Sequence, residues 1–132
     1  MATGFTRNKA SLILNNTLRD SWVCLSTTTP DSAGGNFSEP PEAYGYKRHQ
    51  IGPLDTSISG QVANKDIIFL FEATGDCGSV THVGLSEQEP RGTPVFLMAE
   101  LTAPLPITAG YVPLIRAHNF IVGLDKENLE SY

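Results

Sequence analysis

The sequence has no apolar run of the roughly 18 to 20 residues that a helix needs to cross a bilayer, which excludes a membrane-spanning helix. It also lacks a basic cluster, because its nine lysines and arginines are scattered and the formal net charge is −5. A nucleic-acid-binding domain normally carries a basic stripe. We therefore expect neither a membrane nor a nucleic acid as a partner.

The start of the chain lacks the pattern of a secretory signal. Arg7 and Lys9 are followed by only a short apolar run before Asn15 and Asn16 interrupt it. We therefore expect synthesis in the cytosol. Only two cysteines are present, Cys24 and Cys77, and each lies in an apolar run. In a reducing compartment buried thiols are favoured over a disulfide, although the sequence does not decide whether the two pair.

Signatures of catalysis and metal binding are also missing. His49, His82 and His118 do not stand at ligand spacing, and Cys77 with His82 is too sparse for a zinc site. No Gly-x-Ser-x-Gly elbow is present to activate a serine. The carboxylates are no more numerous than in any acidic β-protein, so they do not indicate a glycosidase. The sequence predicts no catalytic residue, no metal, no cofactor and no enzymatic activity.

The length of 132 residues, with 40% hydrophobic and 17% charged residues, is typical of one globular domain. We predict a single domain over residues 1–132, with a polar arm at 1–8 and a tail at 126–132. Near the start, apolar positions recur at helical spacing and predict a helix over about residues 9–19, capped by Asn8 or Ser11. This stripe consists of Ala10, Ile13, Leu14, Thr17 and Leu18.

The rest of the chain reads as short strands separated by turns rich in glycine, asparagine and aspartate. The predicted strands are 22–26, 45–51, 65–72, 79–86, 94–101, 110–116 and 118–124. With one helix, this pattern predicts a mainly all-β fold, an antiparallel β-sandwich or flattened barrel with a short N-terminal helix. The run 67–71 is apolar on both faces, which predicts a central covered strand. The predicted core residues are Phe69, Phe71, Val83, Phe120 and Val122.

Two segments are candidates for contact with a partner. The polar stretch 27–44 is too long for an ordinary internal connection, and Tyr44 and Tyr46 flank its exit. The apolar stretch 103–115 contains three prolines, so we expect it along a sheet edge that a partner would cover. Tyr44, Tyr46, Tyr111 and Trp22 also permit an aromatic platform for a glycan, although a core position is favoured for Trp22. The predicted contact residues are Pro30, Asp31, Phe37, Tyr44, Tyr46, Leu105, Ile107 and Tyr111.

Several short motifs follow one another in a recognisable order over residues 11–125. They are Asn15-Asn16-Thr17-Leu18-Arg19, the Thr27–Gly34 loop, Gly45-Tyr46 with Arg48, Asn64, Phe69, Gly78–Gly84, Leu101-Thr102-Ala103-Pro104 with Ile107 and Gly110, and the strand Ile121–Asp125. In this order they resemble a family of small bacteriophage virion proteins, usually labelled tail-fibre or structural proteins. The chain departs from the family pattern at Cys77 and at the charged run 47–49.

The resemblance implies a β-rich structural component of a phage particle with no catalytic residues. We therefore predict a virion protein of the tail, baseplate or fibre, made in the host cytoplasm. Its predicted partners are other virion proteins and copies of itself. A capsid decoration (cement) protein is the nearest alternative, and a module that binds a host-surface glycan is a further one.

Overall fold

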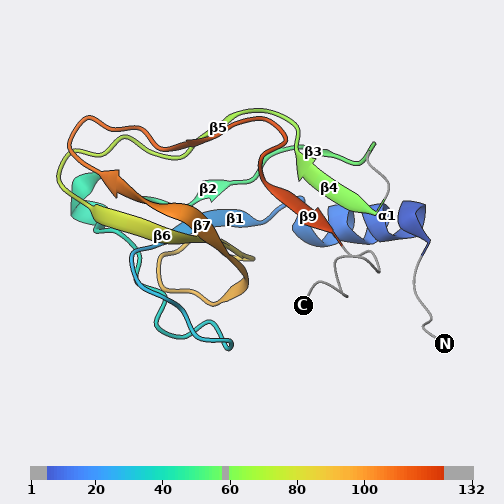
Figure 1. The fold of residues 1–132 in the computed structure, drawn as a ribbon, viewed down its shortest axis with the longest axis horizontal. Helices are drawn as coiled ribbons and strands as arrows, with labels where there is room; N and C mark the ends of the chain where they lie inside the picture. The colour runs from blue at the N-terminus through green and yellow to red at the C-terminus, as the bar shows by residue number, and fades with distance from the viewer. Residues whose placement is uncertain (1–5, 58–59, 124–132) are drawn as a thin grey trace. The chain divides into compact units, whose positions relative to one another are not determined.

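The computed structural model describes residues 6–57 and 60–123 of the chain (Figure 1). The predicted tail, the first five residues of the predicted arm and the end of the predicted strand 118–124 lie outside these ranges. The described residues form two compact units. Unit 1 comprises those within 1–20, 51–68 and 115–132, and unit 2 comprises 21–50 and 69–114. Since the chain passes between the units at residues 20, 50, 68 and 114, neither is one continuous segment, and the single domain stays a prediction.

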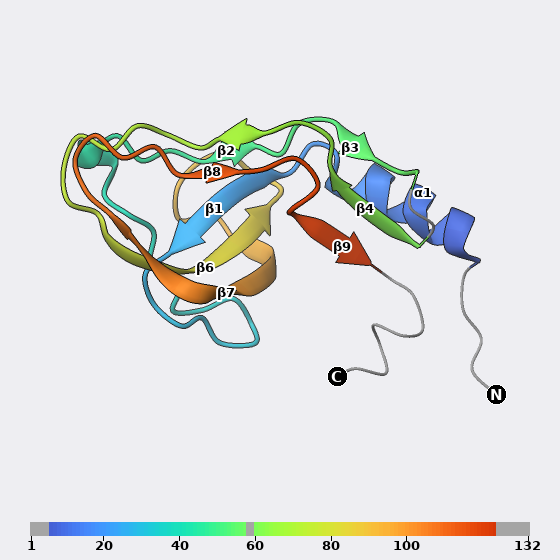
Figure 2. The same ribbon diagram turned by 45° about the horizontal axis from the view of Figure 1, so that its top comes forward.

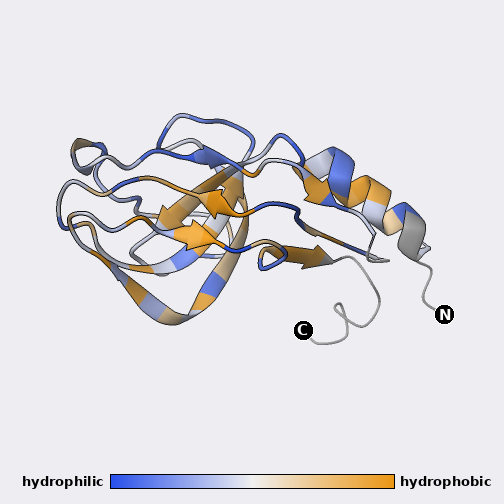
Figure 3. Cartoon of the chain, turned by 90° about the horizontal axis from the view of Figure 1, so that it is seen from above, coloured by the Kyte–Doolittle hydropathy of each residue, from blue (hydrophilic) through white to orange (hydrophobic). Residues whose placement is uncertain are grey.

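Unit 1 is a helix on a small antiparallel sheet. The helix α1 (Arg7–Leu18) lies against β4 (Gln61–Asn64) and β9 (Ile121–Gly123), and β3 (Leu54–Asp55) completes the sheet order β3-β4-β9. Apolar and polar residues alternate around the helix (Figure 3). Ala10, Leu14 and Leu18 are buried, as the stripe predicted.

The helix begins earlier than the sequence predicted. Its N-cap is Thr6, whose Oγ1 accepts a hydrogen bond from the Lys9 backbone N–H at 3.3 Å. This corrects the expected caps Asn8 and Ser11, both of which lie inside the helix. The Ser11 hydroxyl instead accepts a hydrogen bond from the Gly60 backbone N–H at 2.9 Å, which ties the helix to the start of β4.

A buried asparagine organises the rest of unit 1. Asn64 is fully buried, and its amide nitrogen donates to the carbonyls of Asp66 and Arg116, both at 2.9 Å. Its side-chain oxygen accepts from the Phe120 backbone N–H at 2.9 Å. One side chain therefore fixes the turn 116–120, in which His118 has a positive φ of 64°. The same turn places the His118 imidazole 3.0 Å from the Asp55 carboxylate.

Unit 2 contains the main sheet of the described chain (Figure 2). Its strands are β1 (Trp22–Ser26), β2 (His49–Gln50), β6 (Gly78–Ser86) and β7 (Val95–Ile107), antiparallel in the order β2-β1-β6-β7. The register runs from Trp22 opposite Ser86 to Ser26 opposite His82. A 3-10 turn, η1 (Glu42–Tyr44), precedes β2.

A two-stranded ribbon follows the segments that connect the units. It pairs β5 (Ile68–Phe69) with β8 (Leu114–Ile115). Within unit 2 the ribbon continues through two backbone bonds, from Leu70 N to Pro113 O at 2.9 Å and from Ala73 N to Tyr111 O at 3.0 Å. The predicted strands 65–72 and 110–116 are therefore present as a pair, with shorter regular parts than expected.

The predicted class is confirmed: the described chain is mainly antiparallel β-structure with one N-terminal helix. The strand 22–26 has the predicted bounds, and β7 lies at a sheet edge as its prolines indicated. β7 nevertheless extends to Ile107, because an edge strand tolerates Pro104 and Pro106. The short strands β3 and β4 were not predicted, and only residues 49–50 of the predicted strand 45–51 are strand.

The predicted core is partly correct. Phe71, Val83 and Phe120 are buried, with exposed fractions of 5%, 8% and 9%. Val122 is half-buried. The prediction for Phe69 is wrong, because its side chain is 56% exposed. Ile68 and Leu70 face inward, so strand alternation turns Phe69 outward. The ribbon is buried on one face only, whereas the apolar run 67–71 predicted a strand buried on both faces.

This exposure leads to a testable contrast between two phenylalanines. Phe69→Ala should change the free energy of unfolding by less than about 0.5 kcal/mol, as substitutions at exposed positions usually do. Phe71→Ala is the matched buried variant, and it should lower the melting temperature clearly because it leaves a cavity. Thermal unfolding followed by circular dichroism measures both. Equal losses of stability for the two variants would contradict the outward position of Phe69.

Candidate functional site

The candidate contact loop has a defined shape. Thr27 donates its backbone N–H to the Ser38 carbonyl at 2.9 Å, which closes the loop at its base. At the tip, Asp31 N donates to the Gly35 carbonyl at 2.8 Å. The Asp31 carboxylate accepts from the N–H groups of Ala33 and Gly35 at 3.0 and 2.8 Å. The segment Thr27–Ser38, called here the contact loop, is therefore held by its own hydrogen bonds.

The base of the contact loop is fixed to the main sheet by a buried serine. Ser26, the last residue of β1, is fully buried. Its Oγ accepts hydrogen bonds from the N–H groups of Ser38 at 3.1 Å and Thr28 at 3.2 Å, and donates to the Thr28 carbonyl at 2.8 Å. Both stems of the loop thus end on one hydroxyl group of the sheet.

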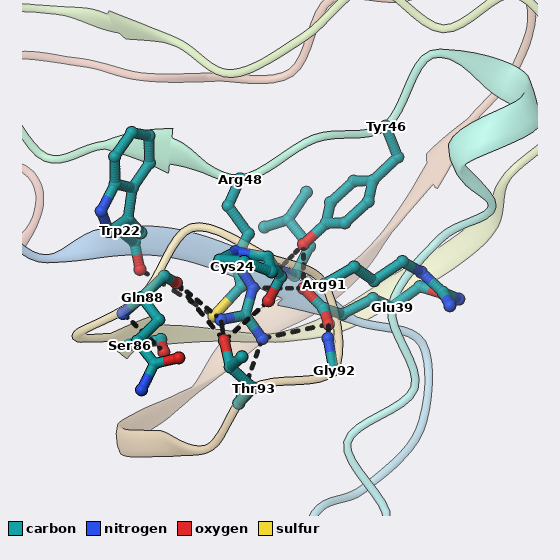
Figure 4. A network of polar contacts seen from close by, with 12 residues as sticks. Trp22, Cys24, Glu39, Tyr46, Arg48, Ser86, Gln88, Arg91, Gly92 and Thr93 are labelled. Atoms are coloured by element: carbon teal, nitrogen blue, oxygen red, sulfur yellow. Dashed lines mark hydrogen bonds and ion pairs between the residues drawn. The ribbon is translucent and has the colours of Figure 1, made fainter.

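A buried ion pair holds the chain directly after the contact loop (Figure 4). The Arg48 guanidinium binds both carboxylate oxygens of Glu39, through Nε at 2.8 Å and Nη2 at 3.1 Å. The side chains are 1% and 3% exposed. A bidentate, charge-assisted pair fixes direction as well as distance. Glu39 is therefore locked to the segment directly before β2, which carries Arg48.

The same pair also holds a second loop, residues 87–93. Arg48 Nη1 donates to the Gln88 carbonyl at 2.9 Å and to Thr93 Oγ1 at 2.6 Å, and Nη2 donates to the Thr93 carbonyl at 2.8 Å. The Gly92 backbone N–H donates to Glu39 Oε2 at 2.8 Å. Figure 4 shows these bonds converging on the guanidinium and the carboxylate. We call Glu39, Arg48, Tyr46 and Thr93 the clamp, because they join the end of the contact loop to the loop 87–93.

Tyr46 completes the clamp from the core side. Its hydroxyl donates to Glu39 Oε1 at 2.7 Å and accepts from the Leu25 backbone N–H at 3.1 Å. Its ring packs edge-on against Phe71, with centroids 5.3 Å apart. The groups that bind the Glu39 carboxylate, from Tyr46, Arg48 and Gly92, all donate hydrogen bonds to it, as an ionised carboxylate requires.

The electrostatics favour the charged pair. Burial raises the pKa of Glu39, but hydrogen bonds from Arg48, Tyr46 and Gly92 outweigh burial and hold it below the usual 4.5. Burial also lowers the pKa of Arg48, but Glu39 overrides that effect and raises it. Burial and the Glu39 carboxylate raise the pKa of Tyr46, so its hydroxyl remains a donor. The Glu39–Arg48 pair of the clamp is therefore charged at neutral pH.

The thiols show no activation. Both cysteines are free and buried. Burial raises the pKa of Cys24 to about 12 and also raises that of Cys77, so both stay protonated and weakly nucleophilic. Among the described residues, no three histidine, cysteine, aspartate or glutamate side chains gather to hold a metal ion. The Glu39–Arg48 pair of the clamp therefore has a structural role: it positions the contact loop and the loop 87–93.

The structure separates the predicted contact residues into two groups. Tyr44 and Tyr111 are 42% and 40% exposed. Asp31 is exposed, while Pro30, Phe37 and Leu105 are half-buried. Tyr46 and Ile107 are 3% and 0% exposed, which corrects the expectation that their side chains face a partner. Tyr46 turns inward to reach Glu39, and Ile107 lies at the buried end of β7.

The edge strand β7 is protected against pairing with another strand. The register between β6 and β7 shifts where Val80 faces Leu105 and His82 faces Glu100, so residues 101–104 bulge. Bulges twist an edge, and Pro104 and Pro106 cannot donate to a new strand. The backbone of the apolar edge that the sequence indicated is therefore poorly suited to pairing with another strand.

Sequence reasoning missed Glu39 as the central residue of this site. Arg48 stood out within the charged run 47–49, but no spacing rule pairs it with a glutamate nine positions earlier. The other partners, Gln88, Gly92 and Thr93, lie more than 35 residues further along the chain. The pairing of β6 with β1, and of β7 with β6, brings the loop 87–93 to the clamp.

The comparisons with known proteins identify the family. A family model described as podophage GP4 fiber I protein gp80 matches residues 9–123. The chain belongs to this family. It is thus a phage fibre protein by family, and a virion component, in agreement with the motifs of the sequence. The comparison with curated proteins gave no match. In the described residues of this fibre-family chain, no helix has the length and hydropathy to cross a membrane.

Proposed function

We propose that this member of the fibre family is a non-enzymatic structural subunit that assembles on the tail, the baseplate or the fibre. Its contacts with other virion proteins, and with copies of itself, are made by exposed side chains of the segments 30–46 and 103–115. The subunit is made in the host cytoplasm and incorporated from there. Neither nucleic acid, membrane nor cofactor takes part in this assembly.

The observation that carries the proposal is the clamp. A solvent-exposed polar loop does not need a buried ion pair to stay soluble, and loops held on a rigid scaffold are where proteins place their contacts. Here Glu39 and Arg48 fix two neighbouring loops at once. A shallow hollow of about 360 Å³ lies between them, lined in part by Phe37, Glu39 and Arg91. A preformed surface of this kind loses less conformational entropy when a partner docks.

Shortening the contact loop tests the proposal. Replacing residues 31–35 by two glycines removes the exposed tip but keeps the hydrogen bonds between Thr27, Ser26 and Ser38. The variant should fold and remain soluble, because the tip contributes no buried apolar side chain. Incorporation into particles should fall strongly, measured by quantitative mass spectrometry of purified virions. A matched control replaces Ala33 by serine, which keeps the tip and its turn.

Full occupancy of particles by the shortened chain would show that the contact loop is not a docking surface. The same measurement gives the copy number of the normal chain. A few copies per particle support the fibre, tail or baseplate, whereas a number matching the capsid lattice would replace this assignment by capsid decoration. Binding of a host-surface glycan to the isolated chain would instead favour the recognition module.

A further inference from the structure

Unit 2 exposes several apolar side chains on its ribbon. Phe69, Tyr111, Val112 and Leu114 are 56%, 40%, 38% and 39% exposed. They lie on two hydrogen-bonded segments, since Leu70 N donates to Pro113 O and Ala73 N to Tyr111 O. Four exposed apolar side chains on one ribbon are more than the scattered single residues that a soluble surface normally shows. We call these four residues the ribbon face.

Carboxylates extend this surface at its end. Glu72 is exposed on the segment that carries Phe69. The turn η1 joins there, because the Thr74 N–H donates to the Tyr44 carbonyl at 2.9 Å. In Figure 2 η1, the 72–77 loop and the 108–111 turn lie together at one end of unit 2. The exposed carboxylates of these segments are Glu42, Glu72 and Asp76.

The charge of the chain is concentrated in unit 2. Its two segments carry eight carboxylates and three basic side chains, so the whole net charge of −5 resides there, while the other residues carry six of each sign. Of the three basic side chains, Arg48 is buried in the clamp and Arg91 donates to the carbonyls of Glu39 and Pro40. Lys47 is thus the remaining basic side chain of unit 2, and it is exposed.

We infer that the ribbon face docks onto a cationic surface of a different virion protein, one that presents lysine or arginine beside apolar side chains. This rests on the proposed function and names the partner chemistry of its second contact segment. Carboxylates at the end of an apolar surface select a basic partner, and Tyr44, Tyr111 and Phe69 add aromatic faces for cation–π contacts. A second copy would bring the same −5 charge, and an anionic polysaccharide or membrane would be repelled.

Charge reversal tests this inference in intact particles. Glu72→Lys should reduce incorporation of the chain by about tenfold or more, because like charges across an interface are strongly unfavourable. Phe69→Ser should reduce it as well, without loss of the folded monomer. Asp20→Lys is the matched control, since it makes the same charge change at an exposed position of unit 1. It should leave incorporation unchanged.

Carbodiimide treatment of purified particles identifies the partner chemistry directly. The reagent joins a carboxylate to a lysine amine as an amide with loss of water, so Glu42, Glu72 or Asp76 should be linked to a lysine of another virion protein. Links only to a second copy of this chain would overturn the inference, as would equal incorporation of Glu72→Lys and Asp20→Lys. So would Phe69-dependent binding of the isolated chain to host lipopolysaccharide.

The two proposals can fail separately. If the shortened contact loop abolishes incorporation while Glu72→Lys does not, the inference about the ribbon face fails and the proposed function stands. If the normal chain is absent from purified particles, the proposed function fails and takes the inference with it.

Discussion

Arg48→Met should destabilise the protein by about 3–5 kcal/mol, the usual cost of removing one partner from a buried ion pair. Methionine keeps much of the side-chain volume but leaves the Glu39 carboxylate buried with only Tyr46 and Gly92 as donors. Lys47→Met is the matched control. It removes a neighbouring exposed cation and should change the free energy of unfolding by less than about 0.5 kcal/mol. Urea denaturation measures both.

The double variant Glu39→Gln with Arg48→Met distinguishes the clamp from a simple packing effect. Once both charges are removed, no uncompensated charge stays buried, so the double variant should be more stable than Arg48→Met alone. Additive losses would show that the two side chains act independently, against the geometry in Figure 4.

The clamp also predicts the acid limb of the stability curve. The folded pKa of Glu39 lies below its unfolded value of about 4.5. The unfolded state therefore binds a proton first as the pH falls. The stability contributed by this carboxylate is complete above about pH 4.5 and is lost as the pH drops through the folded pKa. In the double variant, which lacks the Glu39 carboxylate, the free energy of unfolding should fall less steeply as the pH is lowered from neutral to acid.

Asn64→Asp should have the second large effect, a destabilisation of about 3 kcal/mol or more, because the carboxylate oxygen that replaces the amide nitrogen would be buried against two carbonyl oxygens. The present amide donates to the carbonyls of Asp66 and Arg116, and a carboxylate cannot. The substitution keeps the shape of the side chain, so the loss of stability measures the effect of hydrogen bonding and charge and not that of packing.

Asn119→Asp is the control for this position. Asn119 is exposed in the same turn and should tolerate the change with an effect below about 0.5 kcal/mol. Raising the proton concentration should partly restore Asn64→Asp, since a neutral carboxylic acid can donate to one carbonyl. If the two variants melt at the same temperature, Asn64 does not hold the turn 116–120 as described.

Sequence by itself determined the local features. The 3.6-residue stripe gave α1, since the helical period depends only on neighbouring residues. The bounds of β1 followed from an apolar run. The edge position of β7 followed from its prolines, because proline lacks the N–H that a central strand must donate, whatever the tertiary structure. The motif order also indicated the fibre family, which the match over residues 9–123 shows.

Tertiary structure alone decided which residues meet. Phe69 was expected inside, but its ribbon is covered on one face only, and a run that is apolar at every position does not reveal which face. The pairing of Tyr46 with Glu39 was not predicted, because the clamp is assembled from the chain after the contact loop, the segment before β2 and the distant loop 87–93. Long-range contacts depend on which strands pair, and local pattern does not encode that choice. For the same reason the sequence indicated the two contact segments, while only the fold separated their buried side chains from those that face outward.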